Sequence, residues 1–260
     1  MEQPRNPARA RLAKGELALG MGVRFARTAE IARMMRAAGF DWLFIDLEHG
    51  PGSLELTAQI SCAALDAGIA PLIRVPHGQF DMATRALDGG GWGIVMPHVD
   101  SAEEARALVD HLKYPPLGHR SIVGGLPHFG YAAIKASDAA KLLNAEMLVV
   151  AMVETPRAIA NADAIAAVPG VDAVLIGTND LALEMGIAGE LGHARIVAAY
   201  ETVVAACGKH GKWPGMGGIG DVALVRRYVQ MGVRLVLGSN DTNILAQASA
   251  ERAKALRALL

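Results

Sequence analysis

Acidic and basic side chains follow several short apolar runs of the chain, at positions where a strand would end. The segments FIDLEHGP, LIRVP, VVAMVETP and VLIGTNDL contribute Asp46, Glu48, His49, Arg74, Glu154 and Asp180. Carboxylates that converge repel one another unless a cation binds between them. Glu and Asp oxygens with room for water are the ligands that Mg2+ and Mn2+ prefer. The sequence therefore predicts a divalent-cation site with Glu154 and Asp180 as protein ligands.

The other polar residues at these strand ends predict a chemistry for the site. A divalent ion with open positions can bind the carboxylate and keto oxygens of a 2-oxo acid and stabilise its enolate. Arg74 would add a permanent positive charge, and His49, of a type with a pKa of about 6.5, could carry a proton at neutral pH. Asp46 is predicted to accept hydrogen bonds from the backbone of the following turn. These are the components of an aldol reaction that needs neither a lysine nor an organic cofactor.

Eight short β-type runs alternate with Ala-rich helical stretches, a pattern that predicts parallel strands joined by helical crossovers. The predicted strands are residues 17–23, 41–46, 71–75, 93–96, 147–153, 171–177, 212–216 and 234–238. Eight units in 260 residues favour a single (β/α)8 TIM barrel over a doubly wound α/β sheet, whose glycine-rich first turn is missing. Active-site residues of a barrel stand at the carboxyl ends of its strands.

Capping signals mark several predicted helices. Ser53 and Asn240 each precede a helical pattern, and Ser101 is followed three residues later by Glu104, as in a capping box. Gly68 lies beyond the end of a pattern, where a left-handed cap would be placed. These signals predict where three helices begin and where one ends.

Residues 113–130, KYPPLGHRSIVGGLPHFG, are too rich in Pro and Gly for a helix. Because the segment comes after strand four, it predicts a long loop at the active-site face. His119 and His128 in this loop are candidates for substrate contact. Four other histidines are predicted to be surface or core residues rather than ligands: His98, His111, His193 and His210.

Composition limits the partners and the compartment. The chain is predicted to be one barrel domain, residues 1–260, with residues 1–15 as a flexible N-terminal tail. Its 25 Lys and Arg against 26 Asp and Glu give no electrostatic basis for binding nucleic acid. No apolar stretch approaches the roughly 18 to 20 residues that cross a bilayer, and the first residues lack the centre of a secretory signal. Cys62 and Cys207, in helical patterns, are predicted to be buried free thiols, which favours the cytoplasm.

The motifs together resemble those of the HpcH/HpaI aldolases, the metal-dependent class II pyruvate aldolases. The resemblance rests on FDWLFIDLEHGP, LIRVP, VMPHVDSAEEA, YPPLGHRS, AMVETPRAI, GVDAVLIGTNDLALEMG and a last helix after LGSNDT, in that order. It covers nearly the whole chain after residue 15. It implies reversible cleavage of 4-hydroxy-2-oxo acids in aromatic or sugar acid catabolism, with pyruvate or hydroxypyruvate as enolate donor and an aldehyde as acceptor. The implied cofactor is Mg2+, Mn2+ or Co2+.

The resemblance also implies roles for single residues. Glu154 and Asp180 match the family's metal ligands, and Arg74 matches the arginine that binds pyruvate and its enolate. His49 matches the catalytic histidine. Asp88, in RALDGG, matches the aspartate that pairs with this histidine, a role that spacing alone does not suggest.

Further positions follow from the same resemblance. Gly177 and Thr178 match the turn whose backbone amides receive the substrate carboxylate, and Glu48 matches a position near the metal's waters. The family is usually hexameric, a trimer of dimers in which the last helix is exchanged between neighbouring barrels. The Ala- and Leu-rich residues 243–260 are suited to that exchange.

The sequence departs from the family pattern near the expected substrate pockets, so the acceptor stays open. At 118–121 it has GHRS where many relatives have Gly-x-Arg-Gly. It has Thr178-Asn179 where many relatives have Pro with a small residue, and His98 where a hydrophobic residue is common. Two alternative functions also stay open. One is a lyase of CoA thioesters on the same barrel, for which Arg120, Lys135 and Lys141 would supply basic groups. The other is a metal-binding barrel without catalysis.

Overall fold

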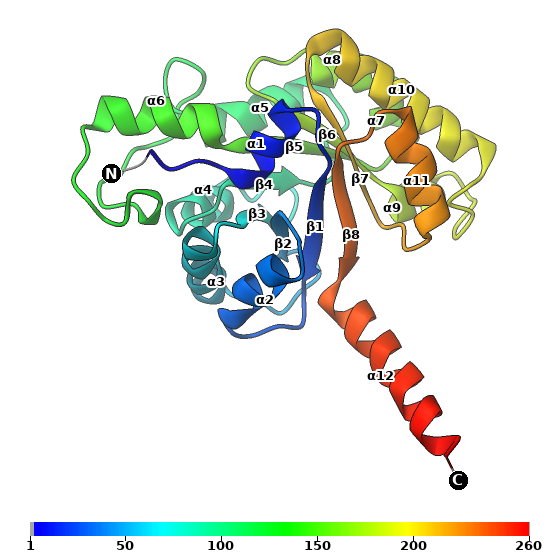
Figure 1. The fold of residues 1–260 in the computed structure, drawn as a ribbon. Coiled ribbons are helices and arrows are strands. Elements are labelled where there is room, and N and C mark those ends of the chain that lie inside the picture. The colour runs from blue at the N-terminus through cyan, green and yellow to red at the C-terminus, as the bar shows by residue number, and fades with distance from the viewer. Residues whose placement is uncertain (1–2, 260) are drawn as a thin grey trace.

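A computed structural model describes residues 3–259, and in them eight parallel strands close into a barrel in chain order (Figure 1). The strands are β1 (Ala18–Val23), β2 (Trp42–Asp46), β3 (Ala70–Arg74), β4 (Gly93–Met96), β5 (Leu148–Val153), β6 (Ala173–Gly177), β7 (Trp213–Gly217) and β8 (Leu235–Asn240). All eight predicted strands are present, with ends displaced by no more than two residues. Strands β1 to β7 are buried almost throughout, because the barrel interior and the surrounding helices cover both faces, whereas β8 is only half-buried from residue 237 on. The predicted TIM-barrel fold is confirmed.

Helices surround the barrel, and the last one projects away from it (Figure 1). They are α1 (Pro7–Ala13), α2 (Glu30–Ala37), α3 (Leu54–Ala67), α4 (Phe80–Asp88), α5 (Ala102–Leu112), the 3-10 turn η1 (Pro127–Phe129), α6 (Ala136–Glu146), α7 (Pro156–Ala160), α8 (Ala162–Ala166), α9 (Thr178–Glu184), α10 (Ala194–His210), α11 (Val222–Met231) and α12 (Asp241–Arg257). Ser53, Ser101 and Asn240 accept hydrogen bonds from the amides of their first helical turns, and Gly68 is left-handed at φ 70°. The predicted caps are confirmed, but the capping box is only half formed, because Glu104 accepts from the Asp100 amide and not from that of Ser101.

The N-terminal segment differs from the predicted flexible tail over residues 1–15, of which residues 1–2 lie outside the described part. Helix α1 packs on β1 with Leu12 buried. Asn6 is fully buried, and its side-chain amide donates to the carbonyls of residues 92 and 146, just before β4 and β5. Arg9 pairs with Asp172 at 2.7 Å. The segment is ordered because these partners lie at the amino ends of the strands, which a local sequence pattern does not reveal.

Asp172 and Lys113 form a buried ion pair beneath the barrel, and its removal should destabilise the fold. The Lys113 side chain is only 2% exposed, and its ammonium lies 3.2 Å from Asp172 Oδ2 and also donates to two backbone carbonyls. Burial lowers the pKa of Lys113, and the charge of Asp172 opposes that effect. We expect Asp172→Ala to lower the free energy of unfolding by about 3 kcal/mol, because an uncompensated ammonium stays buried. Denaturant titration would measure it, with the exposed Asp163→Ala as the matched control; equal midpoints for both variants would contradict the prediction.

The proline- and glycine-rich residues 113–130 lie at the opposite end of the barrel from the one predicted. Helix α5 follows β4 directly and returns the chain to the amino ends of the strands before the loop begins. There His128 Nε2 bonds to the Gly91 carbonyl, and His119 pairs with Asp110. Burial lowers the pKa of His128 to about 4. Neither histidine reaches the carboxyl ends of the strands in its own chain, so the predicted substrate contacts are not made there.

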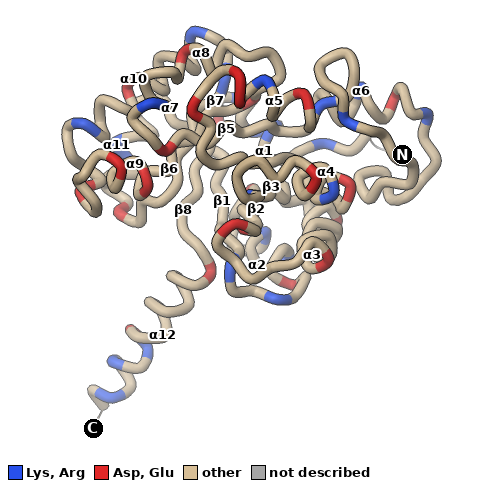
Figure 2. The backbone as a smooth tube through the Cα atoms, turned by 180° about the vertical axis from the view of Figure 1, so that it is seen from behind, with Lys and Arg blue, Asp and Glu red and all other residues tan. Residues whose placement is uncertain are grey.

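Charge and cysteine patterns complete the description of residues 3–259. Acidic and basic residues are interspersed along the backbone (Figure 2). Cys62 and Cys207 are both free; Cys207 is buried as predicted, whereas Cys62 is only half-buried. Burial raises the pKa of the Cys207 thiol to about 12. Within the described residues, no helix has the length and apolar character needed to span a membrane.

Candidate active site

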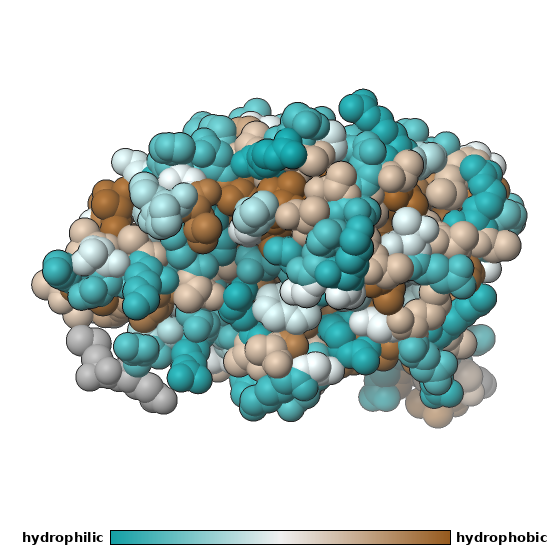
Figure 3. Space-filling view, turned by 90° about the horizontal axis from the view of Figure 1, so that it is seen from above, coloured by the Kyte–Doolittle hydropathy of each residue, from teal (hydrophilic) through white to brown (hydrophobic). Residues whose placement is uncertain are grey.

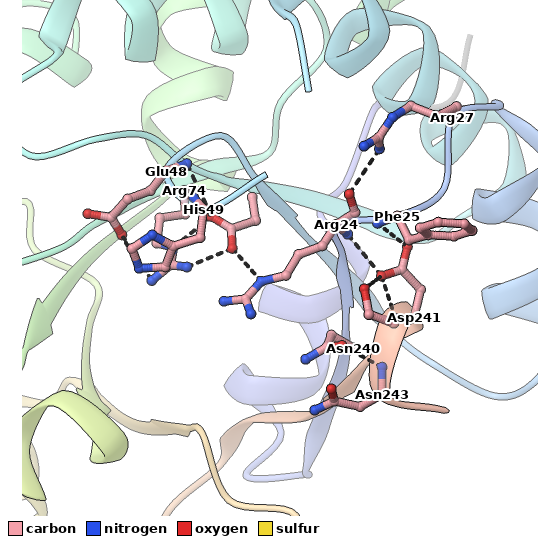
Figure 4. Close-up of polar contacts among 11 residues, drawn as sticks. Arg24, Phe25, Arg27, Glu48, His49, Arg74, Asn240, Asp241 and Asn243 are labelled. Atoms are coloured by element: carbon pink, nitrogen blue, oxygen red, sulfur yellow. Dashed lines mark hydrogen bonds and ion pairs between the residues drawn. The ribbon is translucent and has the colours of Figure 1, made fainter. Parts of the chain in front are cut away.

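The ends of β2 and β3 form the first part of the site, where Asp46 and Arg74 are paired in register. Arg74 lies beside Glu48 and His49 (Figure 4). Arg74 donates from Nε to Asp46 Oδ1 at 2.9 Å and from Nη2 to Oδ2 at 2.6 Å. Burial by itself would raise the pKa of Asp46, but the hydrogen bonds and charge of Arg74 outweigh it and hold that pKa at about 2. Asp46 therefore stays ionised and holds the guanidinium in one orientation.

Asp46 also accepts the predicted backbone bonds, from the amides of Glu48 and His49 at 3.2 Å each. These bonds turn the chain so that Glu48 Oε2 lies 3.0 Å from Arg74 Nη1 and 3.7 Å from His49 Nε2. The His49 ring is 56% exposed, on the solvent side of the pair. The structure thus brings three predicted site residues together around one carboxylate. The hold of Asp46 on Arg74 was not predicted, because it depends on the register between two strands.

Glu154 directly follows β5 and belongs to the next part of the rim. Its carboxyl group is buried. Burial raises its pKa to about 8, and the charge of Asp180 in the first turn of α9 adds to this rise. Arg74 lowers the same pKa and Glu48 raises it further. Glu48, Arg74 and Asp180 are therefore close enough for their charges to act on Glu154, as predicted for side chains at the carboxyl ends of β2, β3, β5 and β6.

The chemistry of Glu154 and Asp180 fits a divalent cation. A buried carboxyl group whose ionisation is opposed by a second carboxylate binds its proton until a cation replaces it. Gly177 leaves space for this group, because a Cβ at that position would collide with Glu154 Oε1. Among residues 3–259 no group of three or more His, Cys, Asp and Glu side chains is arranged to hold a metal by itself. The pair would supply two ligands, and substrate oxygens and water would supply the others.

Thr178 fixes the turn between β6 and α9. Its hydroxyl is fully buried, donates to the Gly217 carbonyl at 2.7 Å and lies 2.7 Å from the Tyr200 hydroxyl. The side chain is therefore occupied by protein partners. Any contact with substrate from this turn would come from the backbone, as the family resemblance implies.

Asp88 is the predicted site residue that the structure places elsewhere. It is the last residue of α4, and because barrel helices run antiparallel to the strands, it lies at the amino end of the barrel. Its carboxylate accepts a 2.6 Å bond from the buried Arg120. The expected pair with His49 is therefore not formed within one chain. A contact between the two side chains would have to join two copies.

Arg24 and His98 also lie at this rim. Neither is among the predicted site residues, although His98 is one of the departures from the family pattern near the expected substrate pockets. Arg24 directly follows β1 and donates from Nε to Asp46 Oδ2 at 2.7 Å. His98 follows β4 in a left-handed conformation, with φ 51°, and its amide donates to Glu154 Oε2 at 3.2 Å. Its ring Nδ1 lies 3.6 Å from the same oxygen. His98 is predicted to be a surface or core residue, and its side chain is 50% exposed. Its place directly after the run GIVMP is the signal that puts it at this rim.

A closed (β/α)8 barrel with a carboxylate pair, an arginine and a histidine at the carboxyl ends of its strands defines a barrel enzyme with a candidate cation site. The sequence profile of the HpcH/HpaI aldolase/citrate lyase family matches residues 25–246, and the chain belongs to this family. It is accordingly a carbon–carbon lyase.

Three relatives illustrate the similarity. The chain is 40% identical to the 4-hydroxy-4-methyl-2-oxoglutarate aldolase of Hapsidospora irregularis, covering 94% of this chain and 92% of that one. It is 33% identical to the hydroxypyruvate/pyruvate aldolase of Cupriavidus necator, covering 97% and 93%. A crystal structure of an HpcH/HpaI aldolase from Desulfitobacterium hafniense superposes with a TM-score of 0.91 at 30% identity, covering 96% of both chains.

Proposed function

We propose that this protein is a divalent-metal-dependent class II aldolase of 4-hydroxy-2-oxo acids, with pyruvate or hydroxypyruvate as enolate donor and an aldehyde or ketone as acceptor. The observation that carries the proposal is the buried Glu154 carboxyl group beside Asp180, facing an arginine that Asp46 holds in place. The names of the relatives, which specify pyruvate, hydroxypyruvate and 4-hydroxy-4-methyl-2-oxoglutarate, support this substrate class.

Each site residue has its own role in the proposed reaction. Glu154 and Asp180 would hold Mg2+, Mn2+ or Co2+, which when bound supplies a Lewis acid that stabilises the enolate of the donor. Arg74, fixed by Asp46, donates hydrogen bonds to the same developing charge. His49 takes the proton of the C4 hydroxyl during cleavage and returns it during addition. The C3–C4 bond breaks, its electron pair forms the enolate, and protonation of that enolate yields the free 2-oxo acid.

The remaining predicted residues bind rather than react. The backbone amides at Gly177 and Thr178 receive the donor carboxylate, and Glu48 orders water beside Arg74. Asp88 would support His49 only from a second copy of the chain. A homo-oligomer is therefore part of the proposal.

We infer a hexamer, a trimer of dimers in which α12 is exchanged between subunits. Helix α12 extends away from the barrel (Figures 1 and 2). It has no buried residue, and Ile244, Leu245 and Leu256 are exposed. At the other end, the loop around residues 117–134 exposes large apolar side chains, and the view from above shows hydrophobic patches among hydrophilic ones (Figure 3). Such surfaces are typical of contacts between copies. A cytoplasmic location of the protein is also part of the proposal, and the free thiols of Cys62 and Cys207 support it.

Removal of divalent ions tests the mechanism directly. Dialysis against a chelator should abolish both aldol cleavage and the exchange of solvent deuterium into the methyl group of pyruvate. Adding Mn2+, Mg2+ or Co2+ back should restore both, and NMR would follow the exchange. Borohydride with pyruvate should trap no adduct, because no lysine forms a Schiff base. Cleavage that persists in chelator, or a trapped adduct, would contradict the proposal.

The CoA-thioester alternative loses one of its supports. Arg120 is almost fully buried and bonded to Asp88, so it is not available to a nucleotide, whereas Lys135 and Lys141 are exposed. Deuterium exchange in the chelator experiment also separates the aldolase from the alternative of a metal-binding barrel without catalysis.

A further inference from the structure

A cavity of about 190 Å3 opens at the carboxyl ends of β1, β7 and β8, beside the site described above. Its lining includes Arg24, Asn179, Leu237, Asn240 and Asn243. Asn179 directly precedes Asp180, so the cavity borders the candidate metal site. Arg24 is the one charged residue among those that line it, and the others are small, neutral or apolar. The cavity therefore favours a ligand group of negative charge.

Arg24 is held in place from two sides (Figure 4). Its Nε donates to Asp46 Oδ2, and the backbone amides of residues 24, 25 and 26 donate to the Asp241 carboxylate at 3.0, 2.9 and 2.7 Å. The side chain is 38% exposed. Within residues 3–259, its two terminal nitrogens have no hydrogen-bond partner, so the open edge of the guanidinium remains for a ligand. Such a fork fits a carboxylate in a bidentate manner.

The same carboxylate, Asp46, thus positions two arginines. Arg74 lies toward Glu48 and Glu154, where the enolate donor would bind, and Arg24 lies toward the adjacent cavity. A molecule bound across both would place one carboxylate group near the metal ligands and a second group at Arg24. A volume of about 190 Å3 equals that of roughly six waters, enough for a three-carbon 2-oxo acid.

We propose that Arg24 binds a carboxylate on the acceptor half of the substrate. The physiological substrate is then a dicarboxylate, a 4-hydroxy-2-oxo acid whose acceptor fragment is itself a small oxo acid. The apolar wall at Leu237 and Ile219 accommodates a methyl group on C4. This inference rests on the aldolase function proposed above and adds the acceptor class and the residue that selects it.

A matched pair of substrates tests Arg24. The first is 4-hydroxy-4-methyl-2-oxoglutarate, and the second is 4-hydroxy-4-methyl-2-oxopentanoate, in which a methyl group replaces the acceptor carboxylate. The wild-type enzyme should prefer the dicarboxylate. Arg24→Met should lower kcat/KM for the dicarboxylate by about 10- to 100-fold, the usual effect of losing a hydrogen-bonded charge pair, and much less for the neutral substrate. Arg24→Lys should recover part of the preference, and the exposed Arg36→Met should keep all of it.

The outcomes separate the two proposals. If Arg24→Met lowers kcat/KM for both substrates by the same factor, or if the wild-type enzyme cleaves both equally well, the role of Arg24 is overturned while the aldolase function stands. If the wild-type enzyme cleaves neither substrate and exchanges no deuterium into pyruvate, both proposals fail. A preference that falls in Arg24→Met but not in Arg36→Met supports the acceptor site.

Discussion

Replacing Glu154 by Gln should lower turnover by about 1,000-fold or more, because the amide cannot supply the charge that holds the cation and its stabilisation of the enolate. The same substitution should stabilise the metal-free protein. The neutral amide removes a buried group whose ionisation is opposed by burial and by Asp180. Loss of activity together with a gain in stability would exclude misfolding as the cause.

The effect of Glu154→Gln on the stability of the metal-free protein should depend on pH. The pKa of Glu154 is about 8 in the folded chain against an ordinary 4.5, so the unfolded chain releases this proton first. The stabilising contribution of the protonated group is complete below pH 4.5 and is lost as the pH rises to about 8. Gln does not titrate. In chelator, the stability of Glu154→Gln relative to the wild type should therefore increase over this pH range.

Thermal unfolding in chelator at several pH values, with kcat/KM at saturating Mn2+, would measure both effects. Glu201→Gln, an exposed carboxylate on α10, is the matched control and should change neither quantity. Binding of Mn2+ to the wild type should strengthen as the pH rises toward 8, because the cation competes with the proton on Glu154. A Glu154→Gln enzyme with wild-type turnover or Mn2+ affinity would refute the assignment of this ligand.

Arg74→Lys should lower kcat/KM by about 100- to 1,000-fold although the positive charge is kept. Arg74 makes two bonds to Asp46 and approaches Glu48 with its third nitrogen, and this arrangement aims the guanidinium at the site. A lysine ammonium is a single point that cannot keep both bonds to Asp46 and also reach the substrate. The loss should appear in pyruvate deuterium exchange as well as in cleavage, because both pass through the enolate.

Kinetics of exchange and cleavage for Arg74→Lys, beside the exposed Arg36→Lys as control, would measure this effect. If Arg74→Lys keeps more than about a tenth of the wild-type rate, charge alone is sufficient and the fixed geometry is unimportant. A loss confined to cleavage, with normal exchange, would instead place Arg74 with the acceptor.

Local patterns were sufficient for the strands and for several site residues. A strand in a parallel barrel is buried on both faces, so its apolar run is visible without knowledge of its neighbours. Polar residues that directly follow such runs must lie at the carboxyl ends. For this reason His49, Arg74, Glu154 and Asp180 could be placed at one rim from their positions alone.

Errors arose where the position depended on the preceding element. The loop at 113–130 follows a helix rather than a strand, so the chain had already returned to the amino ends. Asp88 ends a helix and lies at that same end, so its pairing with His49 stays a prediction for two copies of the chain. The N-terminal segment is ordered by partners more than 80 residues away in sequence, which no local pattern reports.

By itself, the sequence determined the eight-fold repeat, the rim that carries the chemistry and most of the residue types found there, because burial on both strand faces and helix capping leave local signatures. Only the tertiary structure decided that one carboxylate, Asp46, orients both Arg74 and Arg24, and that His98 lies beside Glu154. These contacts join different strands, and register between strands is set by closure of the whole barrel rather than by any one segment.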